Sequence, residues 1–104
     1  MSEREVRDDP AEQRFEILVS GEPAGFSKYQ LMGEDYAFTH TEIDERFEGQ
    51  GLGSALVRGV LDEMRERGAR VLPYCPFVKS FIQRHEEYVD LVPRASRQKF
   101  ELPA

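Results

Sequence analysis

The sequence predicts a single compact α+β domain. Three β-like runs separated by turn residues predict antiparallel strands over residues 14–19, 24–32 and 36–43. Glycines at alternate positions then precede a run with helical spacing, and a short proline-bounded strand and a short last helix follow. The 104 residues leave room for one hydrophobic core. With 39% hydrophobic residues the composition is that of a globular chain and not of a disordered one.

The two ends of the chain show no clear periodicity. Residues 1–13 are polar, so we expect a disordered lead-in. Residues 93–104 are expected to form a C-terminal tail in which Phe100 and Leu102 are the residues able to dock. The domain itself is therefore predicted over residues 14–92.

The first two strands are predicted from alternation. Phe15, Ile17 and Val19 fall on one face of the first run, which ends in the turn residues 20–23. The second run alternates in the same way up to the turn that begins at Gly33. An antiparallel pair is therefore expected.

The third strand is rich in aromatic and β-branched residues. Its alternation places Phe38, His40 and Glu42 on one face and residues that include Thr41 and Ile43 on the other. Because both faces carry apolar and polar side chains, we expect a central strand.

A glycine loop opens the first helix. Gly49, Gly51 and Gly53 lie directly before apolar residues at helical spacing, and the helix is expected to run to about Arg67, with Gly68 as its cap. Glycines at the start of a helix allow backbone N–H groups to face an anion that the helix dipole favours. The loop is therefore a candidate phosphate site, although a tight turn for close packing explains the same glycines.

Two common phosphate motifs do not match. A nucleotide-hydrolysing P-loop requires lysine after the last glycine, where this chain has Ser54. A dinucleotide fold requires an acidic residue at the end of the second strand of a βαβ unit, and that strand ends here at Tyr74 and Cys75.

The fourth strand is predicted over residues 69–75. Pro73 and Pro76 limit it to a sheet edge and predict that it separates from its neighbour. Pro76 is also suited to the first position of a helix, and apolar residues at helical spacing predict a short last helix up to about Tyr88.

Charge and composition exclude several classes of function. The net charge of −6 disfavours direct nucleic-acid binding. No apolar run approaches the roughly 18 residues of a membrane span, and the charged N-terminus lacks a secretion signal, so we expect a cytoplasmic protein that does not bind membranes. One cysteine and two distant histidines predict no disulfide and no metal site. We expect a monomer or a weak dimer.

Two segments resemble the GNAT superfamily of N-acetyltransferases. Residues 43–57, IDERFEGQGLGSALV, look like its acetyl-CoA loop, whose usual pattern is Gln/Arg-x-x-Gly-x-Gly/Ala. Residues 72–78, LPYCPFV, and the helical run that follows are similar to the small stand-alone GNAT-like branch. The resemblance implies a GNAT-like fold and an acetyl-CoA-dependent N-acetyltransferase. Its acceptor would be a primary amine on a small molecule, a protein lysine or a protein N-terminus.

The resemblance also implies where acetyl-CoA binds. Pyrophosphate would lie on the glycine loop, and pantetheine would run along the third strand like an added strand. The implied contacts are Thr41, Ile43, Glu48, Gly49, Gln50, Gly51, Leu52, Gly53, Ser54, Phe77 and Lys79. Glu48 departs from the usual Gln or Arg, which leaves Arg46 or Lys79 as sources of positive charge.

Acetyl transfer requires a base for the amine and a proton donor for the leaving thiolate. His40 is the predicted base, with Glu42 acting through water as the alternative, and Cys75 is the predicted acid or transient acyl carrier. We expect His40 and Cys75 to approach the acetyl group together. Larger relatives often place a tyrosine on the last helix, where this chain has Ile82.

Each candidate also has an ordinary structural explanation. Cys75 is equally consistent with a small core residue, and His40 with a hydrogen-bonded strand residue. The missing tyrosine keeps a second function open, a CoA-binding regulatory or interaction module without turnover. A scaffold without CoA affinity is a third class.

Overall fold

The computed structural model describes residues 3–104 and has the predicted α+β architecture, a curved five-stranded sheet with strand order β1-β2-β3-β4-β5. The first four strands are antiparallel, and β5 pairs in parallel with β4 at the edge. The strands are β1 (Arg4–Asp9), β2 (Arg14–Val19), β3 (Glu22–Met32), β4 (Asp35–Ile43) and β5 (Arg70–Pro73). The α-helices are α1 (Leu52–Arg67) and α2 (Pro76–Arg84), and short 3₁₀ helices are η1 (Glu45–Phe47), η2 (Glu86–Leu91) and η3 (Arg94–Ser96).

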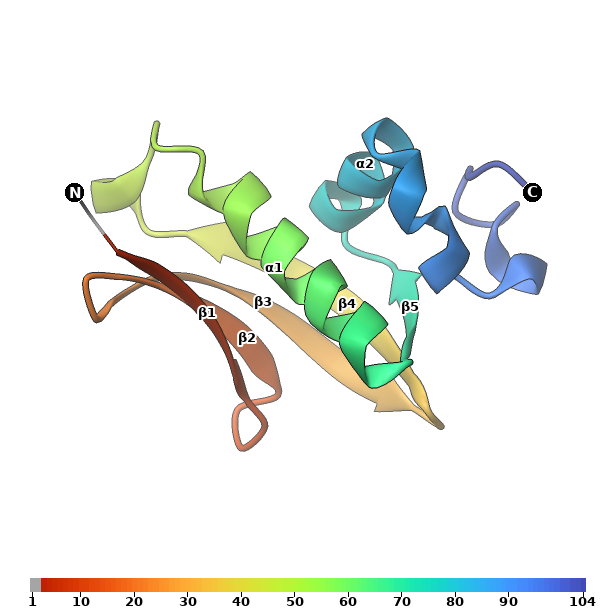
Figure 1. Cartoon of the computed structure of the whole chain (residues 1–104), viewed down its shortest axis with the longest axis horizontal. Helices are drawn as coiled ribbons and strands as arrows, with labels where there is room; N and C mark the ends of the chain where they lie inside the picture. The colour runs from red at the N-terminus through yellow and green to blue at the C-terminus, as the bar shows by residue number, and fades with distance from the viewer. Residues whose placement is uncertain (1–2) are drawn as a thin grey trace.

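Helix α1 lies across one face of the sheet (Figure 1). Its buried residues repeat at helical spacing and form the centre of the core; they are Leu52, Leu56, Val57, Val60, Leu61 and Met64. The helix ends as predicted at Gly68, whose left-handed backbone (φ 66°) lets its N–H donate to the carbonyls of Met64 and Arg65.

The prediction of a disordered lead-in is wrong for residues 3–13, while residues 1 and 2 lie outside the described part. Strand β1 pairs with β2 along its whole length. Val6 packs on α1, where a Cβ at Gly59 would lie only 2.8 Å from Val6 Cγ2. A strand with one apolar residue shows no period, but its backbone gains a full ladder of partners from β2.

A β-bulge corrects the predicted faces of β4. Lys28 is opposite His40, whereas the next residue, Tyr29, is opposite Phe38, so Thr39 is the extra residue. The bulge reverses the alternation. Phe38 is fully buried, while the His40 side chain is 56% exposed, so the prediction that these two residues share a face is wrong.

The C-terminal part differs from the prediction in its last turns. Helix α2 begins at Pro76 as predicted but ends at Arg84, and η2 continues the chain. Phe100 and Leu102 are 5% and 7% exposed and belong to the core cluster, so the tail packs against the domain. Burial of the Phe100 and Leu102 side chains stabilises this packing, and no local sequence pattern specifies where these side chains are buried.

The described residues 3–104 contain neither a membrane-spanning helix nor a cluster of metal ligands. No helix among them is long and apolar enough to cross a membrane. Nor does this part of the chain bring together three His, Cys, Asp or Glu side chains that could hold a metal ion.

Arg65 of α1 makes a two-pronged ion pair with Asp90 of η2, both N···O distances being 2.9 Å. This hydrogen bonding holds the pKa of Asp90 below its usual value. Stability from such a carboxylate is present above the ordinary aspartate pKa and is lost as pH falls through the lower, folded-state pKa. We expect Arg65→Gln to lower the free energy of unfolding at pH 7 by roughly 0.5 kcal/mol, because both side chains are solvent-screened.

Thermal unfolding of the parent and of Arg65→Gln from pH 7 to pH 3 measures this effect. The difference between the two melting temperatures is expected to close below about pH 4. A difference that stays constant down to pH 3 would contradict the ion-pair origin.

Candidate functional site

The loop before α1 presents backbone N–H groups. Gly49 and Gly51 have φ values of 82° and 70°, in the left-handed region that favours glycine. Among the described residues no side chain caps the helix at Gly51, and the first turn of the helix holds no acidic residue. The N–H groups of the first turn are therefore available to an anion from outside the helix.

A groove of about 310 Å³ lies at this helix start. Its lining brings together most of the predicted cofactor residues with Phe47; it consists of Ile43, Phe47, Glu48, Gly49, Gly51, Leu52, Gly53, Ser54 and Phe77. A Cβ at Gly53 would lie 2.8 Å from Cζ of Phe77, so the absence of a side chain at Gly53 lets this ring lie over the helix start. The Leu52 side chain is buried in the core, so Leu52 offers the groove mainly its backbone.

Beyond the groove, β4 has an open edge. Its pairing with β5 ends at Phe38 opposite Pro73, and the Cys75 N–H then donates to the Phe38 carbonyl at 2.7 Å. The predicted separation of the two strands at the prolines is therefore present.

The backbone groups on that edge follow from the ladder between β3 and β4. The Asp44 N–H donates to the Ala24 carbonyl of β3, and neighbouring residues of an antiparallel strand point their backbone groups to opposite sides. Thr41 and Ile43 therefore direct their N–H and C=O groups toward the open side of β4. These are the two positions at which the GNAT resemblance implies a backbone contact with pantetheine.

Cys75 lies where the two strands part. It is 3% exposed, and its thiol donates to Thr41 Oγ1 at 3.4 Å. The same hydroxyl shares a 2.9 Å hydrogen bond with Oγ of Ser27, a fully buried serine that the sequence did not single out. The cysteine is thus held in a small polar cluster inside the core.

His40 and Glu42 lie on the other side of β4. Their side chains are 56% and 62% exposed, and His40 Nε2 lies 3.1 Å from Glu42 Oε1. Residues 40 and 41 point to opposite faces of the strand, and Thr41 is the residue that contacts Cys75. The structure therefore does not bring the His40 and Cys75 side chains together as the sequence analysis expected.

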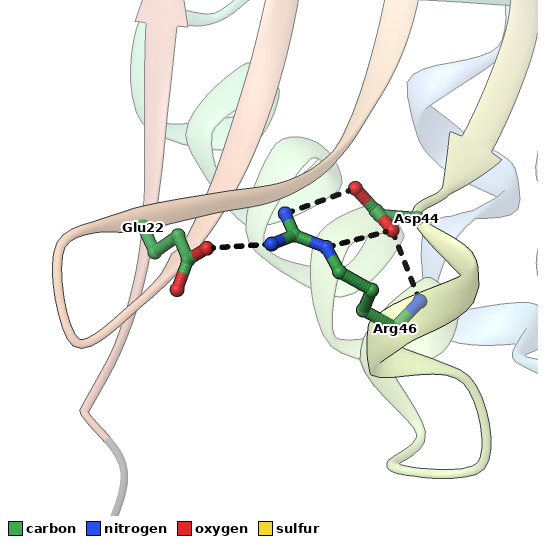
Figure 2. Close-up of polar contacts among 3 residues, drawn as sticks. All are labelled: Glu22, Asp44 and Arg46. Atoms are coloured by element: carbon green, nitrogen blue, oxygen red, sulfur yellow. Dashed lines mark hydrogen bonds and ion pairs between the residues drawn. The ribbon is translucent and has the colours of Figure 1, made fainter.

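The two cations proposed for the loop both have carboxylate partners. Figure 2 shows Arg46 between Asp44 and Glu22, at N···O distances of 3.2 and 3.0 Å. Its hydrogen bonds hold the pKa of Asp44 below its usual value. Lys79 Nζ lies 2.6 Å from Glu101, and this contact lowers the pKa of the Glu101 carboxyl.

Arg46 also lines a second open groove of about 700 Å³ at the ends of β2, β3 and β4. The groove includes Ile43 and Glu48, which line the first groove as well, so the two are neighbours. Glu42 is part of its lining, which places one predicted base at this side of the molecule.

Arg4 is a residue of the site that sequence patterns did not reveal. Its guanidinium donates from Nη2 to the Gln50 carbonyl in the glycine loop at 2.7 Å. The available signal was the placement of Arg4 and Val6 two residues apart ahead of the turn residues Asp9 and Pro10. One apolar residue was too little to predict a strand.

At the position on the last helix where larger relatives often place a tyrosine, this chain has Ile82. Ile82 is fully buried. The Tyr88 hydroxyl donates to Asp62 Oδ1 at 2.7 Å and accepts from Arg58, and burial raises the pKa of Tyr88.

A sheet that opens between β4 and β5 beside a glycine loop is the arrangement that the GNAT resemblance implies. Residues 14–91 match the profile of the GCN5-related N-acetyl-transferase family, so the chain belongs to this family of the GNAT superfamily. The match begins after β1, and the paired strand β1 therefore lies outside it.

Known proteins agree with this assignment at low identity. A GCN5-like protein from Staphylococcus aureus, solved by NMR, has a TM-score of 0.65 at 23% identity, with 89% of this chain and 91% of that chain covered, and supports the fold. The [ribosomal protein bS18]-alanine N-acetyltransferase of Escherichia coli K12 is 29% identical over 58 residues, 56% of this chain and 39% of that protein. The crystal structure of the Escherichia coli S18-alanine enzyme has a TM-score of 0.50 at 27% identity over 58% of this chain and 41% of that chain. This chain thus spans about two fifths of these enzymes.

Proposed function

We propose that this protein transfers the acetyl group of acetyl-CoA to a primary amine. The observation that carries the proposal is the continuity of two features: the uncapped glycine loop at the start of α1, and the open edge of β4 at Thr41 and Ile43. Ile43 lines the groove at that loop, so an extended ligand with an anionic end can contact both.

The residues present suit acetyl-CoA at this place. The pyrophosphate would accept hydrogen bonds from the first-turn N–H groups of α1, where the helix dipole favours negative charge. The amide groups of pantetheine would pair with the backbone of Thr41 and Ile43, as an added strand does. Because Gly53 carries no side chain, the Phe77 ring lies against the helix start and forms an apolar wall of the groove.

The chemistry needs two proton transfers at different atoms. The amine nitrogen forms a bond to the acetyl carbon while the bond from that carbon to sulfur breaks, and His40 or Glu42 accepts the proton that the amine loses. The leaving thiolate takes the proton of Cys75, which regains one from solvent. The amine nitrogen and the sulfur share one carbon, so an acetyl group at the open edge of β4 would have to be reached by Cys75 from one face and by the base from the other, with Glu42 acting through water.

A CoA-binding module without turnover is the second candidate. Two observations favour it: Ile82 fills the position of the expected tyrosine, and Cys75 is almost fully buried. Such a module would bind acetyl-CoA but would acetylate no amine. The acceptor stays unassigned in either case, because the S18-alanine enzymes match only part of this chain.

Acetyl-CoA is expected to stabilise the fold. A ligand at 100 times its Kd contributes about 2.7 kcal/mol, which for a domain of this size raises the melting temperature by on the order of 10 °C. Thermal unfolding with millimolar acetyl-CoA measures the shift, and adenosine, which lacks pyrophosphate and pantetheine, is the control.

Turnover separates the two candidates. An assay of free CoA thiol across a panel of small amines, lysine peptides and N-terminal peptides detects transfer. Binding with acetylation of at least one amine supports the enzyme, and binding without any acetylation supports the module. The absence of any thermal shift would reject both.

A further inference from the structure

Arg4 of β1 is held close to the glycine loop by the packing of its own strand. Arg4 and Val6 are two residues apart and therefore lie on the same face of β1. Val6 packs on α1 at Gly59, and the Arg4 guanidinium reaches the Gln50 carbonyl at 2.7 Å. Figure 1 shows the N-terminal end of β1 near the loop that precedes α1. The contact joins residues 46 positions apart in the sequence.

Arg4 is also the cation that the loop can use. Arg46 is paired with Asp44 and Glu22, and Lys79 with Glu101. Within residues 3–104, no carboxylate pairs with Arg4, and no other side chain donates to the backbone of the loop. Since Glu48 adds a negative charge at the same loop, a cation there without a carboxylate partner offsets part of that charge and so favours a phosphate ligand.

The contact also orients one peptide. In a trans peptide unit the C=O and the N–H point in opposite directions. Because the Gln50 carbonyl faces Arg4 on β1, the Gly51 N–H faces away from β1, on the side where Ile43 and Phe77 line the groove.

We propose that Arg4 is the residue that prepares this loop for pyrophosphate: it fixes the Gln50–Gly51 peptide with the N–H toward the ligand, and it offsets the charge of Glu48. The proposal rests on the proposed function, because it needs CoA to bind at the loop. Arg4 is a positioning residue, and it acts on cofactor affinity and not on the transfer step.

The test uses the full chain and CoA, with affinities from isothermal titration calorimetry at low salt. Arg4→Ala is expected to weaken CoA binding about tenfold, and Arg4→Lys, which keeps the charge and a donor, to stay within about threefold of the parent. Arg4→Gln keeps a donor without the charge and should fall between them. The loss should shrink at high salt, because the guanidinium is exposed.

Arg70→Ala is the matched control. It removes the same charge from an exposed arginine at the start of β5, beside the C-terminal end of α1, and should leave CoA affinity unchanged. Dephospho-CoA keeps the pyrophosphate but lacks the 3′-phosphate, so Arg4→Ala should weaken its binding by the same factor. Once an amine that the parent acetylates is identified, Arg4→Ala should raise KM for acetyl-CoA and leave kcat unchanged.

The outcomes separate this proposal from the proposed function. If the parent binds CoA and Arg4→Ala binds it equally well, the role of Arg4 is wrong and the proposed function stands. A loss that disappears with dephospho-CoA assigns Arg4 to the 3′-phosphate and also overturns the proposal. If the parent binds no CoA, both fail.

Discussion

Replacing Gly53 with valine is expected to abolish CoA binding while the domain stays folded. A Cβ at this position lies 2.8 Å from the Phe77 ring, so the ring must move and the new side chain enters the groove. Loss of two hydrogen bonds to a charged pyrophosphate would weaken binding by at least about a hundredfold. Valine has a better helix propensity than glycine, so α1 itself is not weakened. Calorimetry with CoA and thermal unfolding without it measure the two effects.

Glu66→Val is the control for this prediction, because it places the same side chain at an exposed position of the same helix. It should leave CoA affinity unchanged. Gly51→Val tests the same loop through its left-handed backbone, where a β-branched residue is strained. If Gly53→Val and Gly51→Val both fold and bind CoA normally, the assignment of the loop to pyrophosphate is wrong.

Replacing Cys75 with alanine is expected to lower acetyl transfer at least tenfold while CoA affinity stays nearly intact. General acid–base assistance is typically worth about two to four decades in rate, and the pyrophosphate loop is untouched by the change. Because Cys75 is buried, some loss of stability accompanies the variant, so turnover is measured well below its melting temperature. Steady-state rates at saturating acetyl-CoA and calorimetry with CoA separate turnover from binding.

The matched variant is Thr41→Val, which removes the hydroxyl that accepts from the Cys75 thiol and keeps the thiol itself. It should reduce turnover less than Cys75→Ala does. Mass spectrometry of the protein with acetyl-CoA alone distinguishes an acyl carrier, which gains one acetyl group at Cys75, from a proton donor, which does not. Unchanged turnover of Cys75→Ala on an amine that the parent acetylates would return Cys75 to the role of a core residue, with Glu42 or an ordered water as the preferred proton acceptor.

The local elements of this fold were readable because each has a short-range cause. The alternation from Phe15 to Val19, the glycines before α1 and the cap at Gly68 depend on backbone geometry within a few residues. Prolines at 73 and 76 remove backbone donors, and so they predicted that β5 separates from β4 and that α2 begins at Pro76, although β5 ends at Pro73 and not at Cys75 as predicted.

The face of a strand on which a residue lies, and the residue that it pairs with, were less predictable. A single bulge at Thr39 reversed the alternation of β4, and so it separated His40 from Phe38 and put Thr41, which contacts Cys75, on the face of Phe38 instead. Nothing in a period-2 pattern marks which residue a partner strand will skip, because the register is set by the pairing of two strands.

The sequence by itself determined the α+β class, the glycine loop ahead of α1 and the resemblance that the family match then confirmed. Only the tertiary structure decided that β1 exists, that Arg46 and Lys79 are paired with carboxylates, and that Arg4 reaches the loop. The physical reason is the range of the interactions. Helix caps and turns are specified by neighbouring residues, whereas edge-strand pairing and ion pairs join residues far apart in the chain and depend on the folded arrangement of all the elements between them.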